Sequence, residues 1–359
     1  MAREDFGAVS AAPDVAPVRP DEQLDAAAVA AYLRGKLPEA DRPLEILQFP
    51  GGHANLTYLL RYGDREYVLR RPPLGPIAPR AHDMVREYRA LAALGPYYAP
   101  APRVYVLCED PAVIGAPFFV MERRHGIVVR RTMPDEIPDD PTIRRRIGEA
   151  VVDALADLHA VPVAGTAVAA LGKPEGFVAR QISGWAERWQ RAQTEPLPVM
   201  EDLAAWLAAR IPPALDATVV HNDFKLDNVM LDRDDPGRVV AVLDWDMTTL
   251  GDPRIDVGTL LGYWPEATDP PQRLAVAMQP TYLEGFPTRR EVVARYATRS
   301  GRDLGAIAFF ETFALFKLAV VLQQIYVRFV RGQTKDERFA AMGEAVRHLA
   351  DIASATRTT

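Results

Sequence analysis

The hydrophobic and polar positions follow two different rhythms along the chain. Over roughly the first 120 residues, short β-forming runs alternate with polar turns, a pattern typical of strands. Gly63 and Asp64 separate two of these runs and predict a hairpin turn. We expect strands over 44–49, 55–62, 65–71, 103–110 and 116–123.

Helical spacing appears in two other segments of this region. Residues 82–94 carry apolar side chains on one helical face, and residues 21–37 predict a helix with Asp25 as its N-cap. Residues 1–20 are rich in alanine and proline and lack a continuous apolar run. We therefore expect a disordered tail there and no secretory signal.

Beyond Met121 the pattern becomes mostly helical, with apolar positions recurring on one face of each segment. We expect helices over 141–161, 177–192, 200–211, 288–301, 305–330 and 335–353. One strand pair, 218–224 with 238–245, interrupts them across a turn-rich link. The predicted fold class is α+β, with a small antiparallel β-rich lobe over 21–122 and a larger, mostly helical lobe over 123–359.

Composition narrows the class of protein. The 359 residues suffice for two lobes, and 48% hydrophobic with 25% charged residues is typical of a globular protein. The net charge of -6 argues against a general affinity for nucleic acid. Cys108 is the only cysteine, so no intramolecular disulfide can form, which suits a cytoplasmic location.

The most apolar segment, 305–330, is long enough to cross a membrane. Glu311, Lys317 and Arg328 interrupt it, and charges at mid-span are costly in a bilayer. We therefore expect a core helix here and no membrane partner.

Residues 218–231, TVVHNDFKLDNVML, concentrate polar side chains between apolar runs. The pattern is H-x-D-x-x-x-x-N, followed after a hairpin by Asp244 at a strand end. Phosphoryl transfer needs a carboxylate that orients the attacking hydroxyl, and an amide with a second carboxylate to hold Mg²⁺. Asp223 fits the first role, while Asn228 and Asp244 supply the hard oxygen ligands that Mg²⁺ prefers. Lys225 is placed to offset charge on the transferring phosphate.

Other interpretations of this loop carry less weight. Asp223 and Asn228 are residue types that favour solvated turns, but the strands on both sides favour catalysis. His221 is expected to brace the loop rather than act as a base. A transition-metal site would need a second histidine or cysteine nearby, which the sequence does not supply. Asp256 is expected to brace the catalytic loop as well.

These residues resemble the kinase-like fold, and in particular the aminoglycoside phosphotransferase family. That family carries a catalytic loop similar to HNDFKLDN and a metal-binding Asp in a segment similar to VLDWDMTTLGDPRIDVG. The resemblance covers about residues 25–350. It implies a bilobal protein-kinase-like fold with ATP and Mg²⁺ as cofactors, and ATP bound between the lobes.

The resemblance also implies a nucleotide-binding loop in the first lobe. Segment 49–60 is similar to the loop that covers the ATP phosphates. Glycines there allow close approach of the backbone to phosphate, while side chains with polar groups donate hydrogen bonds. The residues implied are Gly51, Gly52, Asn55 and Thr57.

Arg70 stands where most kinases carry a lysine, and Glu87 resembles the helix partner of that residue. Arginine also binds phosphate, but with a planar geometry that differs from that of lysine. We expect Arg70 to grip the nucleotide phosphates and to pair with Glu87. Met121 and Arg123 lie in a segment similar to the hinge whose backbone meets adenine. Whether the nucleotide is ATP or GTP is left open by the sequence.

Within the family, the chain is most similar to the kinase-like domain associated with acyl-CoA dehydrogenases, through 67–75, 103–123 and 180–189. This likeness implies a hydroxylated metabolite as acceptor, such as a hydroxy acid or hydroxyacyl-CoA, and a functional link to an acyl-CoA dehydrogenase. Cations near the site would suit such an acceptor. The candidates are Arg180, Arg188 and Arg254.

Two alternatives of other kinds stay open. An aminoglycoside acceptor is a polycation and needs an acidic cleft. Its candidate residues are Glu201, Asp202, Glu266, Asp269 and Glu284. A pseudokinase module would bind nucleotide without catalysis, with Arg70 as the mark of lost activity. Trp185 and Trp189 lie four residues apart, so core packing is the default role and acceptor contact the alternative.

Overall fold

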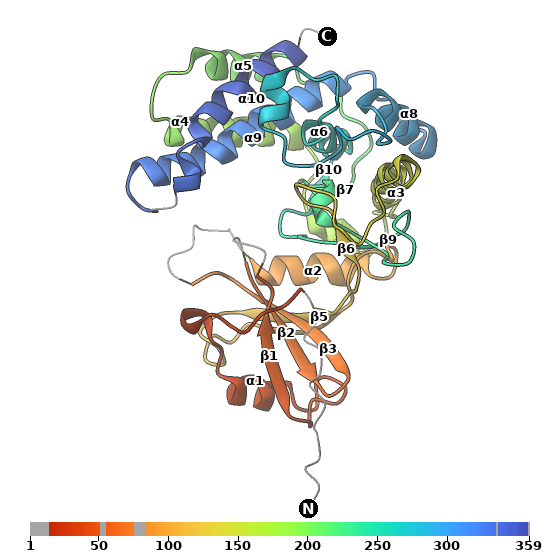
Figure 1. The fold of residues 1–359 in the computed structure, drawn as a ribbon, viewed down its shortest axis with the longest axis vertical. Coiled ribbons are helices and arrows are strands. Elements are labelled where there is room, and N and C mark those ends of the chain that lie inside the picture. The colour runs from red at the N-terminus through yellow and green to blue at the C-terminus, as the bar shows by residue number, and fades with distance from the viewer. Residues whose placement is uncertain (1–13, 51–54, 75–82, 335–336, 358–359) are drawn as a thin grey trace, which may run out of the picture. The chain divides into compact units, whose positions relative to one another are not determined.

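A computed structural model describes residues 14–50, 55–74, 83–334 and 337–357 of the chain. The chain separates into two compact units. The first comprises Met1–Gly95 and Pro102–Arg124, and the second comprises Pro96–Ala101 and His125–Thr359. Each unit is described by itself below (Figure 1).

The first unit is built on a five-stranded antiparallel sheet in the order β1-β2-β3-β5-β4. The hairpin predicted at Gly63 joins β2 to β3, and this glycine has a φ of 60°. Such a conformation is easy for glycine because it has no Cβ. The strands are β1 (Leu44–Gln48), β2 (Leu56–Tyr62), β3 (Arg65–Arg71), β4 (Val104–Cys108) and β5 (Phe118–Glu122).

Two helices accompany this sheet. α1 (Ala26–Leu33) begins at Asp25, whose side chain accepts from the amide of Ala28, so the predicted N-cap is present while the helix is shorter than 21–37. α2 (Met84–Leu94) begins after Asp83 and packs against β4 and β5. This contact fixes the position of Glu87, which lies in the first turn of α2.

Residues 14–20 do not form the tail that was predicted over 1–20. Ala16 pairs with Gln48 in an antiparallel bridge, with main-chain hydrogen bonds of 2.9 and 2.8 Å. The amide of Arg19 donates to the Gln48 side chain at 3.0 Å. These bonds extend an edge strand and satisfy its main chain, which a composition-based prediction does not see. Residues 1–13 lie outside the described residues.

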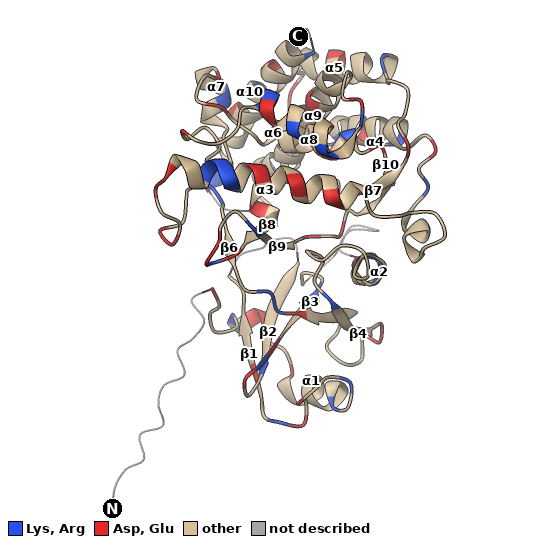
Figure 2. Ribbon diagram, turned by 90° about the vertical axis from the view of Figure 1, so that its right-hand side faces the viewer, with Lys and Arg blue, Asp and Glu red and all other residues tan. Residues whose placement is uncertain are grey.

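The second unit is mainly helical. Its helices are α3 (Pro141–His159), α4 (Phe177–Ala192), α5 (Pro198–Ala209), α6 (Arg254–Gly262), α7 (Pro271–Ala275), α8 (Arg289–Ser300), α9 (Ile307–Val330) and α10 (Met342–Thr356). Figure 2 shows acidic and basic residues at positions along α3, which packs beside α8. Ion pairs join these two helices, among them Arg295 with Asp153 at 2.7 Å and Arg299 with Asp157 at 2.6 Å.

Short strands of the second unit carry the polar segment 221–228. They are β6 (Ile127–Val128), β7 (Thr218–Val220), β8 (Val229–Leu231), β9 (Val239–Val242) and β10 (Thr249–Gly251). The predicted pairing of 218–224 with 238–245 is wrong. β7 pairs with β10, whereas β9 pairs with β8, the strand that follows the polar loop. The turn over 232–238 closes the β8–β9 hairpin, and the polar loop itself reverses the chain before it.

The most apolar segment is a core helix of the second unit, as predicted. α9 has the length and hydropathy to cross a membrane, yet 56% of its apolar window is buried inside the protein. It packs against α4, α5, α6 and α10 (Figure 1). At its contact with α6, a Cβ on Gly258 would lie 2.5 Å from the Phe310 main chain, so only glycine permits this close approach.

Candidate functional site

The loop from His221 to Asn228 follows β7 and contains a residue with a left-handed main-chain conformation. Asn222 has a φ of 66°, in the left-handed region that asparagine tolerates better than most residues. Its side-chain amide donates to the carbonyl of Met247 at 2.8 Å. The strained conformation is therefore stabilised by its own side chain as well as by its neighbours.

His221 braces the loop through hydrogen bonds at both of its ring nitrogens. Its Nε2 lies 2.9 Å from the carbonyl of Leu243, to which it must donate. Its Nδ1 accepts from the amide of Asp223 at 3.3 Å. Both ring nitrogens are thus used, in the neutral tautomer that these partners require. The predicted structural role of His221 agrees with this geometry.

Asp256, the first-turn acid of α6, anchors the start of the loop. Its two carboxylate oxygens accept from the amides of His221 at 2.6 Å and Asn222 at 2.7 Å. Its buried Oδ2 also lies 3.2 Å from Nε2 of His159. Burial works to raise the pKa of Asp256, but the His159 imidazole and these donors more than offset it and lower that pKa. Asp256 braces the loop as predicted.

His159 continues this buried network to α8. Its Nδ1 lies 2.6 Å from the hydroxyl of Tyr296. Burial lowers the pKa of His159, although the neighbouring Asp256 opposes that shift. A neutral His159 donates to Asp256 and accepts from Tyr296, so all three groups are satisfied.

Asp223, Lys225 and Asn228 come together in one cluster. Lys225 Nζ donates to Oδ2 of Asp223 at 2.8 Å. Asn228 Nδ2 donates to the carbonyl of Asp223 at 2.9 Å and to its Oδ2 at 3.1 Å. The carboxylate that was predicted to orient an attacking hydroxyl is therefore fixed by a cation and an amide.

Asn228 and Asp244 lie at the same end of the β8–β9 hairpin. Val229 pairs with Val242, and the amide of Leu243 then donates to the carbonyl of Asn228 at 2.8 Å. Asp244 follows at once, with a φ of 66°. The hairpin therefore brings the side-chain amide of Asn228 and the carboxylate of Asp244 to the same end of its two strands.

This donor set fits Mg²⁺. Hard oxygen ligands are what Mg²⁺ takes, and it commonly needs only one or two from protein beside those of a phosphate substrate. Because Asn228 donates through Nδ2 to Asp223, its Oδ1 is the atom left for a cation. Within the described residues, groups of three or more His, Cys, Asp or Glu side chains that could hold a metal are absent.

The side chain of Lys225 lies in a polar cluster with Asp223, Asp227 and Tyr263. Burial disfavours its ammonium, but Tyr263 and Asp223 outweigh burial and raise the pKa of Lys225. Its Nζ lies 4.9 Å from the centre of the Tyr263 ring, a cation–π contact. Burial raises the pKa of Asp227, and Lys225, 3.9 Å away, opposes that shift. The lysine therefore stays charged beside the Asp223 carboxylate.

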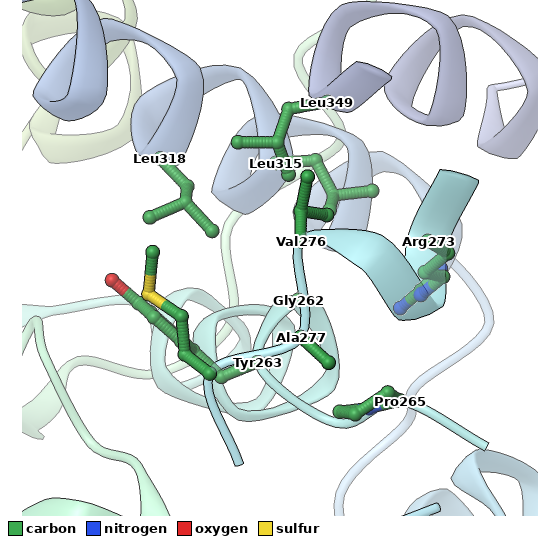
Figure 3. A pocket seen from close by; sticks show the side chains of 10 residues that line it. Gly262, Tyr263, Pro265, Arg273, Val276, Ala277, Leu315, Leu318 and Leu349 are labelled. Carbon is green, nitrogen blue, oxygen red and sulfur yellow. The ribbon is translucent and has the colours of Figure 1, made fainter. Parts of the chain in front are cut away.

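Tyr263 also lines a small cavity (Figure 3). Its volume of about 20 Å³ is enough for about one water molecule. The lining is mostly aliphatic and comes from α6, α7, α9, α10 and the residues that follow α6 and α7, including Tyr263, Val276, Leu315, Leu318 and Leu349. A cavity of this size and lining is a packing defect rather than a substrate site.

Arg70 and Glu87 form the predicted ion pair in the first unit. Arg70 Nε lies 3.3 Å from Oε1 of Glu87, and the two side chains are 12% and 1% exposed. Thr57 is directly opposite Arg70 in the β2–β3 register. Asn55, just before β2, is buried. The predicted Gly51 and Gly52 lie outside the described residues.

The structure describes both residues of the predicted hinge, Met121 and Arg123, in the first unit. Met121 lies inside the sheet, in register with Val68 and Val104. The Arg123 guanidinium pairs with Asp14 at 2.5 Å and lies 4.8 Å from the Phe49 ring. Its side chain therefore ties the amino-terminal segment to the sheet.

The three arginines predicted to suit an acidic acceptor differ in their surroundings. Arg254 is buried and pairs with Asp252 at 2.6 Å, so its charge is neutralised. Arg180, in α4, donates to main-chain carbonyls of the segment that precedes this helix, one of them that of Lys173 at 2.5 Å. Arg188 is exposed and lies 4.6 Å from the ring of Trp185. Arg188 is thus the one of these three candidates whose charge faces solvent beside an aromatic ring.

Trp185 and Trp189 both belong to the helical core, as the default interpretation held. Trp185 also lies 5.5 Å from Nζ of Lys317, which reaches the 221–228 loop from α9. The sequence interpretation missed Lys317, Tyr263 and His159 as parts of the site. For Lys317 a signal existed, because a lysine in the middle of the most apolar helix needs a polar partner.

Comparisons with known proteins agree on one family. The sequence pattern of the APH family, a phosphotransferase enzyme family, matches residues 45–292. Acyl-CoA dehydrogenase family member 10 of Mus musculus is 34% identical over 345 residues, which cover 95% of this chain and 32% of the mouse protein. The chain thus spans about a third of that relative's length.

Solved structures give the same picture of the fold. A Ralstonia eutropha protein assigned to the aminoglycoside phosphotransferases is 30% identical, with a TM-score of 0.79 over 94% of this chain and 99% of that one. A thermostable mutant of aminoglycoside phosphotransferase APH(4)-Ia, solved with AMP-PNP and hygromycin B, is 16% identical. Its TM-score is 0.56 over 92% of this chain and 98% of that one, a likeness of fold alone.

Proposed function

Because the chain belongs to the APH phosphotransferase family, we propose that it transfers the γ-phosphoryl group of ATP to a hydroxyl of a small molecule, with Mg²⁺. The observation that carries this proposal is the cluster of Asp223, Lys225 and Asn228 on a loop braced by a neutral His221. Phosphoryl transfer depends on positioning and on charge stabilisation, and this cluster supplies both.

Asp223 has the role of orienting the acceptor. Its carboxylate accepts the hydrogen bond of the acceptor hydroxyl and takes its proton as the bond to phosphorus forms. Lys225 holds this carboxylate in the resting protein and offsets the negative charge that develops on the transferring phosphoryl oxygens.

Asn228 and Asp244 are the residues that would hold Mg²⁺, through the side-chain oxygens at one end of the β8–β9 hairpin. When bound, the cation neutralises phosphate charge and orients the nucleotide for in-line transfer. The nucleotide complex of the related-fold APH(4)-Ia supports ATP as the donor.

The first unit has the role of binding the nucleotide phosphates. Arg70 supplies a guanidinium that matches phosphate geometry, and Glu87 keeps it extended along the sheet. The base is assigned to main-chain atoms of the hinge segment that includes Met121 and Arg123, and the Arg123 side chain pairs with Asp14. Gly51, Gly52, Asn55 and Thr57 remain in this proposal as the phosphate-covering residues.

For the acceptor we propose a hydroxylated metabolite with an acidic group, such as a hydroxy acid or hydroxyacyl-CoA. Arg188 at the Trp185 ring offers an exposed cation on the same unit as Asp223. Three of the acids that a polycationic aminoglycoside would need are already engaged. Glu266 and Asp269 pair with Arg289, and Glu201 accepts from the Trp189 indole.

The likeness to acyl-CoA dehydrogenase family members supports a functional link to fatty acyl-CoA oxidation. In this proposal the phosphorylated hydroxy acid is passed to a dehydrogenase partner in the cytoplasm.

A thermal-shift titration tests the nucleotide part of the proposal. A ligand that binds only the folded protein raises its melting temperature by mass action. We expect a rise with ATP that needs Mg²⁺ and is reversed by EDTA, and parallel titrations with GTP decide between the nucleotides. No shift at millimolar MgATP would leave a protein without a working nucleotide site.

Product mass tests the acceptor. Hydroxy acids, their CoA esters and aminoglycosides are incubated with the protein and MgATP, and a gain of one phosphoryl group is sought. The Arg188→Met variant is expected to raise KM for the acidic acceptor with kcat unchanged. Nucleotide binding without any phosphorylated product would favour the pseudokinase alternative, and phosphorylation of aminoglycosides alone would overturn the acidic acceptor.

A further inference from the structure

A lysine from the core helix reaches the catalytic loop. Lys317 lies in the middle of α9, ninety-five residues from its partner, and its Nζ donates to the main-chain carbonyl of Asn222. The side chain passes the indole of Trp185, whose ring centre is 5.5 Å from Nζ. None of the roles assigned above uses this cation.

The peptide group between Asn222 and Asp223 is held at both of its polar atoms. Its carbonyl accepts from Lys317, and its amide donates to Nδ1 of His221 at 3.3 Å. The preceding amide, that of Asn222, donates to Asp256 at 2.7 Å. A peptide plane fixed on both sides cannot rotate, so the direction in which Cα of Asp223 projects its carboxylate is fixed as well.

We propose that Lys317 is a positioning residue, which sets the main-chain orientation of Asp223 for phosphoryl transfer. The inference rests on the proposed function in taking Asp223 as the acceptor-orienting carboxylate. The role proposed for Lys317 lies in its contact with the main chain of Asn222.

The charges around Lys317 explain why a lysine occupies an apolar helix. Burial lowers the pKa of Lys317, while the carboxylates of Asp223 and Asp256 oppose that shift. Asp246 acts in the same sense, and Lys225 in the opposite one. The ammonium thus lies among acids of the loop, and a hydrogen bond from a charged donor to a carbonyl is stronger than one between neutral groups.

The test removes this donor and compares it with a matched loss elsewhere on α9. Lys317→Met deletes the ammonium but keeps the apolar stem. Gln323→Met is the control, since Gln323 also donates from α9 to a main-chain carbonyl, that of Ala192 at 2.9 Å, away from the loop. Lys317→Arg restores a charged donor.

Two measurements are made on each variant. Hydrogen exchange of the peptide that contains 221–228 is expected to quicken in Lys317→Met and to stay as in the wild type in Gln323→Met. Formation of ADP from MgATP, with water as the acceptor, is expected to lose about 10- to 100-fold in kcat with KM for MgATP unchanged. Lys317→Arg is expected to recover most of both.

Unchanged exchange in Lys317→Met, or equal effects in Lys317→Met and Gln323→Met, would overturn the proposal. If Lys317→Met does not fold, Lys317→Gln is measured in its place, because it keeps a polar side chain with a shorter reach. A wild-type protein that forms no ADP would contradict the proposed function, and the exchange measurement would still decide the role of Lys317.

Discussion

Asn228 donates its side-chain amide to both the carbonyl and the carboxylate of Asp223, at 2.9 and 3.1 Å. One amide therefore ties the proposed acceptor-orienting residue to the proposed metal site. Its nitrogen is committed to Asp223, and this commitment turns its oxygen to the side where a cation is proposed.

Replacing Asp223 is expected to separate binding from turnover. Asp223→Ala leaves Asn228 and Asp244 in place, so the melting-temperature rise with MgATP is retained. Loss of an acid–base group costs about 10²- to 10⁴-fold in rate, so phosphoryl transfer becomes undetectable or nearly so. Rates and melting temperatures are measured together, with Asp234→Ala in the exposed β8–β9 turn as the control. Full turnover in Asp223→Ala would remove Asp223 from the mechanism.

Asp244→Asn is expected to abolish the Mg²⁺-dependent part of nucleotide binding. Asparagine tolerates the φ of 66° at this position, so the backbone is kept while the anionic ligand is lost. The melting temperature of the variant with ATP should then be the same with Mg²⁺ and with EDTA. Asp234→Asn carries the same change of charge away from the site. If Asp244→Asn keeps the wild-type Mg²⁺ response, the metal is held elsewhere.

Arg70 and Glu87 are expected to stabilise the first unit only while both partners of their ion pair are present. Arg70→Met leaves the carboxylate of Glu87, 1% exposed, without its cation, and breaking a buried pair costs about 3–5 kcal/mol. Adding Glu87→Gln should recover most of this loss because the buried charge is gone. Urea unfolding of the two single variants and the double variant measures the coupling. Independent, additive losses would mean that the pair contributes little.

The stability of the second unit is expected to fall as pH falls below about 6.5, the ordinary pKa of histidine. His159 has a lowered pKa in the folded protein, so between that lowered value and 6.5 the unfolded chain binds more protons. One such group contributes a slope of at most about 1.4 kcal/mol per pH unit. Urea unfolding from pH 7.5 to 5.5 measures it.

His159→Gln should flatten this slope, and His348→Gln on the partly exposed side of α10 should leave it unchanged. An unaltered slope in His159→Gln would show that another group is responsible. A slope of the opposite sign would mean that His159 is charged in the folded protein.

The sequence predicted the local chemistry of the site better than its long-range support. The grouping of Asp223, Asn228 and Asp244 could be predicted from their spacing because a short loop and a hairpin bring these residues together. Arg70 and Glu87 could be paired because strand and helix signals place both. The contacts of Lys317 and His159 join residues about a hundred positions apart, and a single sequence carries no pattern for such pairs.

The strand pairing failed for a related reason. β7 pairs with β10 because Asp256 and the α6 start fold back over the loop, and the alternation of β7 alone fits either partner. The pairing of Arg123 with Asp14 could not be predicted because Asp14 lies in a segment whose composition predicted a tail.

The position of α9 in the chain also bears on how the protein is made. This apolar helix leaves the ribosome after α4, α5 and α6, which supply much of the surface that covers it, and only α10 among its main neighbours comes later. Nascent domains fold as their partners become available, and exposed apolar stretches aggregate. A segment with the hydropathy of a membrane anchor is thus synthesised after three of the helices that pack against it. This order shortens the time during which membranes or chaperones would capture it.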